Sequence, residues 1–140
     1  MKTVMYYITV AILFVLNKLP MSIMHFLSTL LYYPIYHIAR YRRKVVRDNL
    51  VKSFPEKSLD EIKRIEKKFY HSLCDYFMEM IKYYGMSEEK VKEYMKIEGL
   101  EHFQAALDRG QSCALYMGHF FNWEYVTSIT LHLKRDDTVV

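Results

Sequence analysis

The sequence predicts a helix-rich α/β protein: N-terminal membrane anchor helices, a helical segment, and the start of a parallel α/β sheet that the end of the chain truncates. Residues 1–39 contain no acidic residue. Residues 40–94 are densely charged, and they combine helix caps with apolar side chains at three- and four-residue steps. Residues 95–140 alternate strand patterns with amphipathic helix patterns. We therefore expect an anchor (1–39), a basic juxtamembrane and helical segment (40–94) and the start of an α/β domain (95–140).

The predicted anchor consists of two apolar runs. Val4 to Leu16 is nearly unbroken, but it is shorter than the roughly 20 residues that cross a bilayer. It continues past Pro20 into a second run, Met21 to Ala39. Four interpretations remain open: one tilted span with a kinked interfacial continuation, a helical hairpin in one leaflet, a cleaved signal peptide, or two buried helices in a larger soluble core.

A basic cluster follows the apolar runs directly. Its five cations favour a cytoplasmic membrane face rich in anionic lipid. A nucleic-acid patch is the alternative, but no base-stacking motif accompanies the cluster. The cations are Arg40, Arg42, Arg43, Lys44 and Arg47.

Three helices are predicted between residues 40 and 94. Asp48 to Phe54 is a short amphipathic piece. Ser58 and Glu61 have the spacing of a capping box, which predicts a long helix that Gly85 ends. Ser87 starts a shorter helix through about Tyr94. Glu79 is interpreted as a solvated edge residue rather than part of a pocket. The apolar stripe expected on the long helix is Ile62, Ile65, Phe69, Leu73, Tyr76, Phe77, Met80 and Ile81.

Strand and helix patterns then alternate, which predicts parallel pairing with right-handed crossovers. Pairing partners would lie beyond residue 140, so we expect a truncated protein. The expected elements are an edge strand at Met95–Glu98, a helix at Leu100–Leu107, a turn at Asp108–Gly110, a buried strand at Cys113–Met117, a helix from Trp123 to about Leu133 and a strand beginning at Thr138.

The segment between the second strand and its helix is the candidate catalytic site. On one continuous helix, His119 and Glu124 would point about 140° apart. At a strand-to-helix turn they can meet, with Asn122 as N-cap and Glu124 in the first helical turn. An imidazole beside a carboxylate is an oriented base. The alternative is a surface or structural pair. The other five histidines, His25, His37, His71, His102 and His132, are interpreted as structural.

The two cysteines, Cys74 and Cys113, lie in apolar sequence without CxxC spacing. They are interpreted as reduced core thiols, and neither has a second ligand at zinc-site spacing. We expect no metal and no cofactor.

The sequence resembles the lipid A biosynthesis lauroyl/myristoyl acyltransferases, within the lysophospholipid and glycerolipid acyltransferase group. Gly118 to Glu124, GHFFNWE, carries the group's His-x4-acid motif in its Glu form. Arg47 to Glu56 is similar to the family's R..NL..SFPE segment, and Ile97 to Glu101 matches a third piece. Phe121 stands where the family often has glycine. The resemblance covers the whole chain but only the N-terminal half of a full-length member.

The resemblance implies an O-acyltransferase of the bacterial inner membrane, with its catalytic part on the cytoplasmic side. His119 would be the base and Glu124 would hold it, while Gly118, Asn122, Arg42 and Arg43 are assigned to substrate binding. The implied partners are an acyl carrier protein or coenzyme A thioester, a lipid A precursor or related glycolipid as acceptor, and the membrane, but no nucleic acid. Two alternatives stay open: a phospholipid acceptor, or a non-catalytic membrane-tethered fragment. We expect this chain alone to be inactive.

Overall fold

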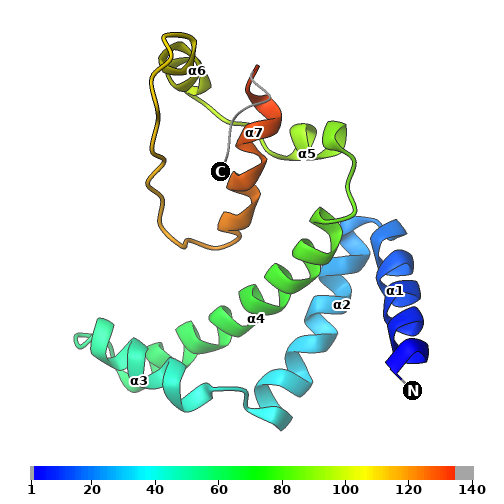
Figure 1. Cartoon of the computed structure of the whole chain (residues 1–140). Coiled ribbons are helices and arrows are strands. Elements are labelled where there is room, and N and C mark those ends of the chain that lie inside the picture. The colour runs from blue at the N-terminus through cyan, green and yellow to red at the C-terminus, as the bar shows by residue number, and fades with distance from the viewer. Residues whose placement is uncertain (1, 135–140) are drawn as a thin grey trace. The chain divides into compact units, whose positions relative to one another are not determined.

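The computed structural model describes residues 2–134, and every regular element in that range is helical (Figure 1). The chain forms two compact units, Met1–Gly85 and Met86–Val140. The first unit contains α1 (Lys2–Lys18), α2 (Met21–Tyr33), the π-helical turn η1 (Pro34–Ala39), α3 (Arg43–Ser53) and α4 (Leu59–Tyr83). The second contains α5 (Glu88–Tyr94), α6 (Leu100–Asp108), the 3-10 helix η2 (Trp123–Ser128) and α7 (Ile129–His132).

The predicted α/β sheet is wrong for the residues described. Met95–Glu98 and Cys113–Met117 are extended or irregular, and neither pairs with a strand within residues 2–134. A short extended segment without a hydrogen-bonded neighbour gains little from its conformation, which explains why strand-like patterns alone did not produce strands. The third expected strand, from Thr138, lies outside the described residues.

The predicted membrane anchor helices are also wrong. Among residues 2–134 there is no helix with the length and apolar character needed to cross a membrane. The two apolar runs form two separate helices: the 17-residue α1 ends at Lys18, and α2 begins directly after Pro20. A proline lacks the backbone N–H that a continuous helix would need at this position. The second run packs against α4 and buries Met24, Ser28 and Tyr32.

The helices predicted from capping residues are confirmed. The Ser58 side chain accepts a hydrogen bond from the backbone N–H of Glu61, and the Glu61 carboxylate accepts one from the backbone N–H of Ser58. Ser87 caps α5 in the same position, and α6 begins at Leu100 as expected. The starts of α4 and α5 were predictable because a cap is a local interaction between residues three apart.

The buried face of α4 differs from the predicted apolar stripe. Ile62, Glu66, Tyr70 and Cys74 are buried, whereas Phe69 keeps 43% of its surface exposed. The four buried residues follow one another at four-residue steps, so they lie along one side of the helix. The packing of α2, η1 and α3 selects this side, and it includes a glutamate that the sequence pattern had not placed inside.

Helix α2 lies antiparallel beside α4 (Figure 1). Contacts at one end join His25 to Glu79, with Nε2 and Oε1 3.1 Å apart. Near the middle the Ser28 hydroxyl donates to the Asp75 carboxylate. At the other end is an aromatic core, in which Tyr32 stacks on Tyr36 and on His71, and Tyr70 and Cys74 complete the buried cluster.

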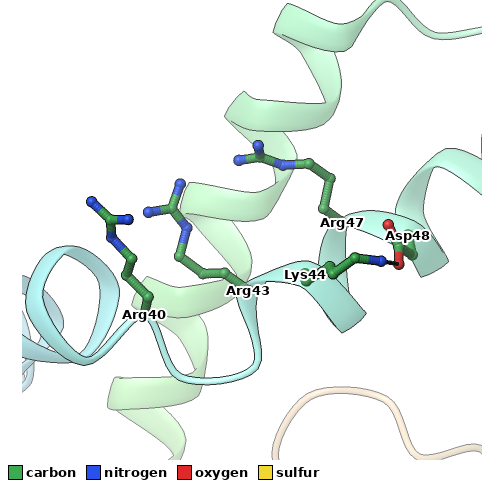
Figure 2. Close-up of a pocket in the computed structure, with 5 residues that line it drawn as sticks. All are labelled: Arg40, Arg43, Lys44, Arg47 and Asp48. Atoms are coloured by element: carbon green, nitrogen blue, oxygen red, sulfur yellow. Dashed lines mark hydrogen bonds and ion pairs between the residues drawn. The ribbon is translucent and has the colours of Figure 1, made fainter.

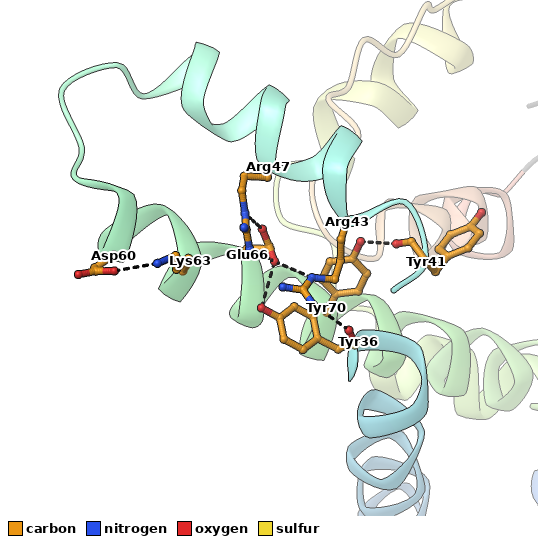
Figure 3. Close-up of polar contacts among 8 residues, drawn as sticks. All are labelled: Tyr36, Tyr41, Arg43, Arg47, Asp60, Lys63, Glu66 and Tyr70. Carbon is orange, nitrogen blue, oxygen red and sulfur yellow. Dashed lines mark hydrogen bonds and ion pairs between the residues drawn. The ribbon is translucent and has the colours of Figure 1, made fainter. Parts of the chain in front are cut away.

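Glu66 is the polar centre of this end of the first unit (Figure 3). Its side chain is fully buried, and both carboxylate oxygens accept hydrogen bonds. Arg47 donates from Nε to Oε2 at 2.6 Å and from Nη2 to Oε1 at 2.9 Å. Arg43 donates from Nε to Oε1 at 3.1 Å, and the Tyr36 hydroxyl donates to the same oxygen at 3.0 Å. One carboxylate therefore joins η1, α3 and α4.

Two opposing effects act on the pKa of Glu66. Burial raises it, because removing a carboxylate from water disfavours the charged form. Hydrogen bonds from Arg47 and Tyr36, together with the positive charge of Arg47, lower it by more. The pKa of Glu66 therefore lies below its ordinary value, and the carboxylate stays charged in the folded protein.

We predict that Glu66→Gln destabilises the protein by about 3 kcal/mol, because it leaves two partly buried guanidinium groups without their counter-charge. Urea unfolding followed by circular dichroism measures the loss. Glu56→Gln is the matched control, since that side chain is 65% exposed. Equal stabilities of the two variants would show that the buried ion cluster contributes nothing.

The lowered pKa of Glu66 also predicts a pH dependence. A carboxylate whose pKa is depressed by folding adds stability above its unfolded pKa, and that stability is lost as the pH falls through the folded pKa. Between about pH 6 and about pH 3, the unfolding free energy of the wild type should fall more steeply than that of Glu66→Gln. Parallel curves for the two proteins would contradict the assignment.

Candidate functional site

The segment that carries the acid–base motif is an exposed loop followed by a helical turn. Residues 111–120 are irregular and exposed, and η2 begins at Trp123 and leads directly into α7. The predicted helix from Trp123 to about Leu133 is thus confirmed, with its first turns in 3-10 geometry. His119 precedes the helix and Glu124 lies in its first turn, as expected. His119 does not follow a strand, because residues 113–117 form none.

The imidazole of His119 contacts the indole of Trp123. Their ring centroids are 4.4 Å apart and the planes are tilted by 57°. A tight turn, in which the Phe120 N–H donates to the Gly118 carbonyl at 2.8 Å, brings the histidine back toward the helix start. Sequence reasoning missed Trp123 as the ring neighbour of His119. Side chains four residues apart are neighbours within a helix, but His119 precedes η2, so no sequence signal indicated this contact.

Gly118 and Asn122 flank the histidine. A Cβ at Gly118 would meet no atom within 4 Å, so the backbone there is open to an approaching group. Asn122 occupies the N-cap position of η2, as predicted, but its side chain makes no capping hydrogen bond. Their assignment to substrate binding remains a prediction.

The two arginines assigned to substrate binding belong to the first unit. Arg42 has φ 50 and stands at the N-cap of α3. Arg43 donates to Glu66, and its guanidinium lies 4.3 Å from the Tyr36 ring centroid. Arg43 therefore has a structural role that the sequence did not indicate. The signal was present in the four-residue steps Ile62, Glu66, Tyr70, which put a carboxylate in line with buried side chains.

The structure also places the other side chains for which the sequence analysis assigned a role. His25, interpreted as lying within the anchor, contacts Glu79 on α4. Cys74 is buried, and burial raises the pKa of its thiol, as expected for a core cysteine. Cys113 is exposed, so its interpretation as a core thiol is wrong. Within residues 2–134, no three His, Cys, Asp or Glu side chains gather as a metal site would require.

His119 is thus an exposed imidazole before η2, and Glu124 lies in the first turn of that helix. The family model of the bacterial lipid A biosynthesis acyltransferases matches residues 1–138. This match spans nearly the whole sequence, so the chain belongs to that family, and the resemblance read from GHFFNWE is confirmed. Comparison with curated proteins and with solved structures gave no match. Membership implies acyl transfer from an acyl donor to a lipid acceptor in general.

Phe121 adopts a left-handed backbone conformation in the middle of the motif, with φ 51. This conformation disfavours any residue with a Cβ and suits glycine, the residue often found there in the family. The phenyl ring is 54% exposed and so gains little from burial. Phe121 is therefore a strained position next to His119.

We predict that Phe121→Gly is more stable than Phe121→Ala by about 1 kcal/mol, because both remove the ring but only glycine removes the Cβ clash. Thermal unfolding of the two variants measures the difference. If alanine proves as stable as glycine, the left-handed conformation is not strained in solution.

Proposed function

We propose that the protein transfers a fatty acyl group from an acyl thioester to a hydroxyl of a lipid A precursor or related glycolipid, with His119 as general base. The observation that supports this best is the exposed imidazole of His119, five residues before Glu124, in a chain that belongs to a lipid A acyltransferase family. The donor would be an acyl carrier protein or coenzyme A thioester.

The chemistry follows from the weakness of a neutral hydroxyl as a nucleophile. His119 takes the hydroxyl proton as the oxygen attacks the thioester carbonyl carbon. The new C–O bond forms, the C–S bond breaks, and the leaving thiolate receives the proton from the imidazolium. No covalent acyl-enzyme is needed, so neither cysteine has a catalytic part in this proposal.

Trp123 and Glu124 have supporting roles in the proposal. The indole limits the orientations of the His119 ring, which lowers the entropic cost of aiming its nitrogen at the acceptor. Glu124, five residues after His119, is proposed to stabilise the charged form of the imidazole during the reaction. Glu124 is partly buried, so its charge is less screened than that of a fully exposed side chain.

We further propose that the protein works at the cytoplasmic face of the bacterial inner membrane by lying on the bilayer surface. None of the residues of α1 described by the structure is buried, and most of them are apolar. An exposed apolar helix favours the boundary between headgroups and acyl chains. The basic residues after position 39 suit the anionic cytoplasmic leaflet.

We predict that His119→Ala lowers kcat by a factor of about 10² to 10⁴, the usual contribution of a general base. The assay uses the product of the whole reading frame with an acyl thioester and candidate lipids. His102→Ala is the control, because that imidazole is 88% exposed on α6. Undiminished activity in His119→Ala would refute the assignment. Mass spectrometry of the product identifies the acceptor, and acylation only of phospholipid would replace the glycolipid in the proposal.

We also predict that Ile8→Asp combined with Ile12→Asp weakens binding to phosphatidylcholine vesicles about tenfold or more, because two apolar contacts with the bilayer are lost. Both side chains are more than half exposed and lie one helical turn apart on α1. Co-sedimentation measures the binding. Val51→Asp with Leu59→Asp introduces the same charges at exposed positions outside α1 and should bind like the wild type. Equal binding by all three proteins would exclude α1 as the membrane contact.

A further inference from the structure

A basic pocket lies at the start of α3, in the first unit (Figure 2). Its volume is about 510 Å³, within the range of small-molecule sites. The guanidinium groups of Arg40, Arg43 and Arg47 lie on one side of the turn, and Lys44 points toward Asp48 (Figure 2). These five residues line the pocket.

The backbone gathers these side chains through an unusual turn. Arg40 and Arg42 both have left-handed conformations, with φ 49 and 50. The two residues lie in the connection between η1 and α3, and Arg40 lines the pocket together with residues of α3. On α3, Arg43 and Arg47 share one face because they are four residues apart, and so do Lys44 and Asp48.

Arg43 and Arg47 form the rigid part of the pocket. Both guanidinium groups pair with the buried carboxylate of Glu66. The side chain of Arg43 remains 26% exposed and that of Arg47 35% exposed. Arg43 donates to Glu66 and to the Tyr36 carbonyl, and Arg47 donates twice to Glu66, so each guanidinium keeps further N–H donors for a ligand. Side chains already held in place lose little entropy when a ligand binds.

Arg40 and Lys44 form the adjustable part. Within residues 2–134, the Arg40 guanidinium makes no hydrogen bond or ion pair. Lys44 pairs with Asp48 at 2.7 Å, but both are solvent-accessible, and such a pair is weak enough for a ligand to displace. Four cations face two carboxylates, Asp48 and Glu66, so the pocket has a net charge of +2.

We propose that this pocket binds the phosphate group of a lipid headgroup. Guanidinium forks match the oxygens of a phosphate, and a phosphate monoester carries a charge of about −1.5 to −2 that the pocket would balance. The ligand is assigned as a lipid because exposed apolar side chains flank Arg40 in the chain: Ile38 is 81% exposed and Tyr41 56%. The inference goes beyond the proposed acyl transfer, since this binding does not involve His119.

The test compares two double variants that each remove one arginine and one lysine. Arg40→Gln/Lys44→Gln alters the pocket without touching the contacts of Glu66. Arg64→Gln/Lys68→Gln removes the same charge from a second basic hollow on α4, which Lys57 and Glu61 also line. Binding is measured with vesicles of phosphatidylcholine, with the same vesicles containing phosphatidic acid, and with inorganic phosphate alone. Circular dichroism verifies that both variants keep the helical content of the wild type.

Phosphatidic acid should increase the affinity of the wild type for vesicles, and the pocket variant should lose about tenfold or more of that increase. The loss in the control variant should be smaller than this by a factor of at least about three. Equal losses in both variants would mean general surface attraction and would overturn it. A second result would also overturn the proposal: the wild type binds inorganic phosphate, but the pocket variant binds phosphatidic acid vesicles as tightly as the wild type does. His119→Ala should keep wild-type binding in every arm, so loss of acyl transfer and loss of phosphate binding are separate results.

Discussion

The first unit depends on the burial of one charged carboxylate. Glu66 lies inside the helical layer formed by η1, α3 and α4, where an unpaired charge would be very costly. Arg43, Arg47 and Tyr36 each donate to it, and each comes from a segment other than α4. The hydrogen bonds from Arg43 and Arg47 to Glu66 fix the position of α3, and they thereby stabilise the left-handed turn between η1 and α3. The cost of taking these charges from water means that such a cluster specifies an arrangement more than it adds stability.

This constraint also changes how the basic residues are to be understood. In sequence they form one uniform run of cations suited to an anionic surface. In the structure they divide by function: Arg43 and Arg47 are held inward by Glu66, whereas Arg40 and Lys44 remain available at the surface. Because the held pair keeps donors on its outer side, the structural cluster and the proposed phosphate pocket share side chains. Stability and binding are then properties of the same few residues.

In the second unit, the candidate catalytic histidine depends on local geometry. A tight turn at Gly118 and a left-handed residue at Phe121 bring the His119 ring onto Trp123 at the start of η2. Strained backbone conformations are common at sites where a functional side chain needs one orientation. They persist only because the surrounding structure prevents the residue from relaxing. The turn between His119 and Glu124 was predicted from an apolar strand pattern followed by a helix pattern, and the helix forms whereas residues 113–117 form no strand.

Features that arise between near neighbours follow from the sequence alone. The Ser58–Glu61 capping box, the start of α5 after Ser87, the extent of α6 and the helical turn at Glu124 were all predictable because the groups involved lie within a few residues of each other. The family was also readable from GHFFNWE. Long-range packing, by contrast, sets which side of α4 is buried, that Met21–Tyr33 packs as a helix on α4, and that residues 113–117 form no strand. Those outcomes depend on partners far away in the chain: Glu66 is buried because Arg43 and Arg47 meet it, and an extended segment becomes a strand only when another strand supplies its hydrogen bonds.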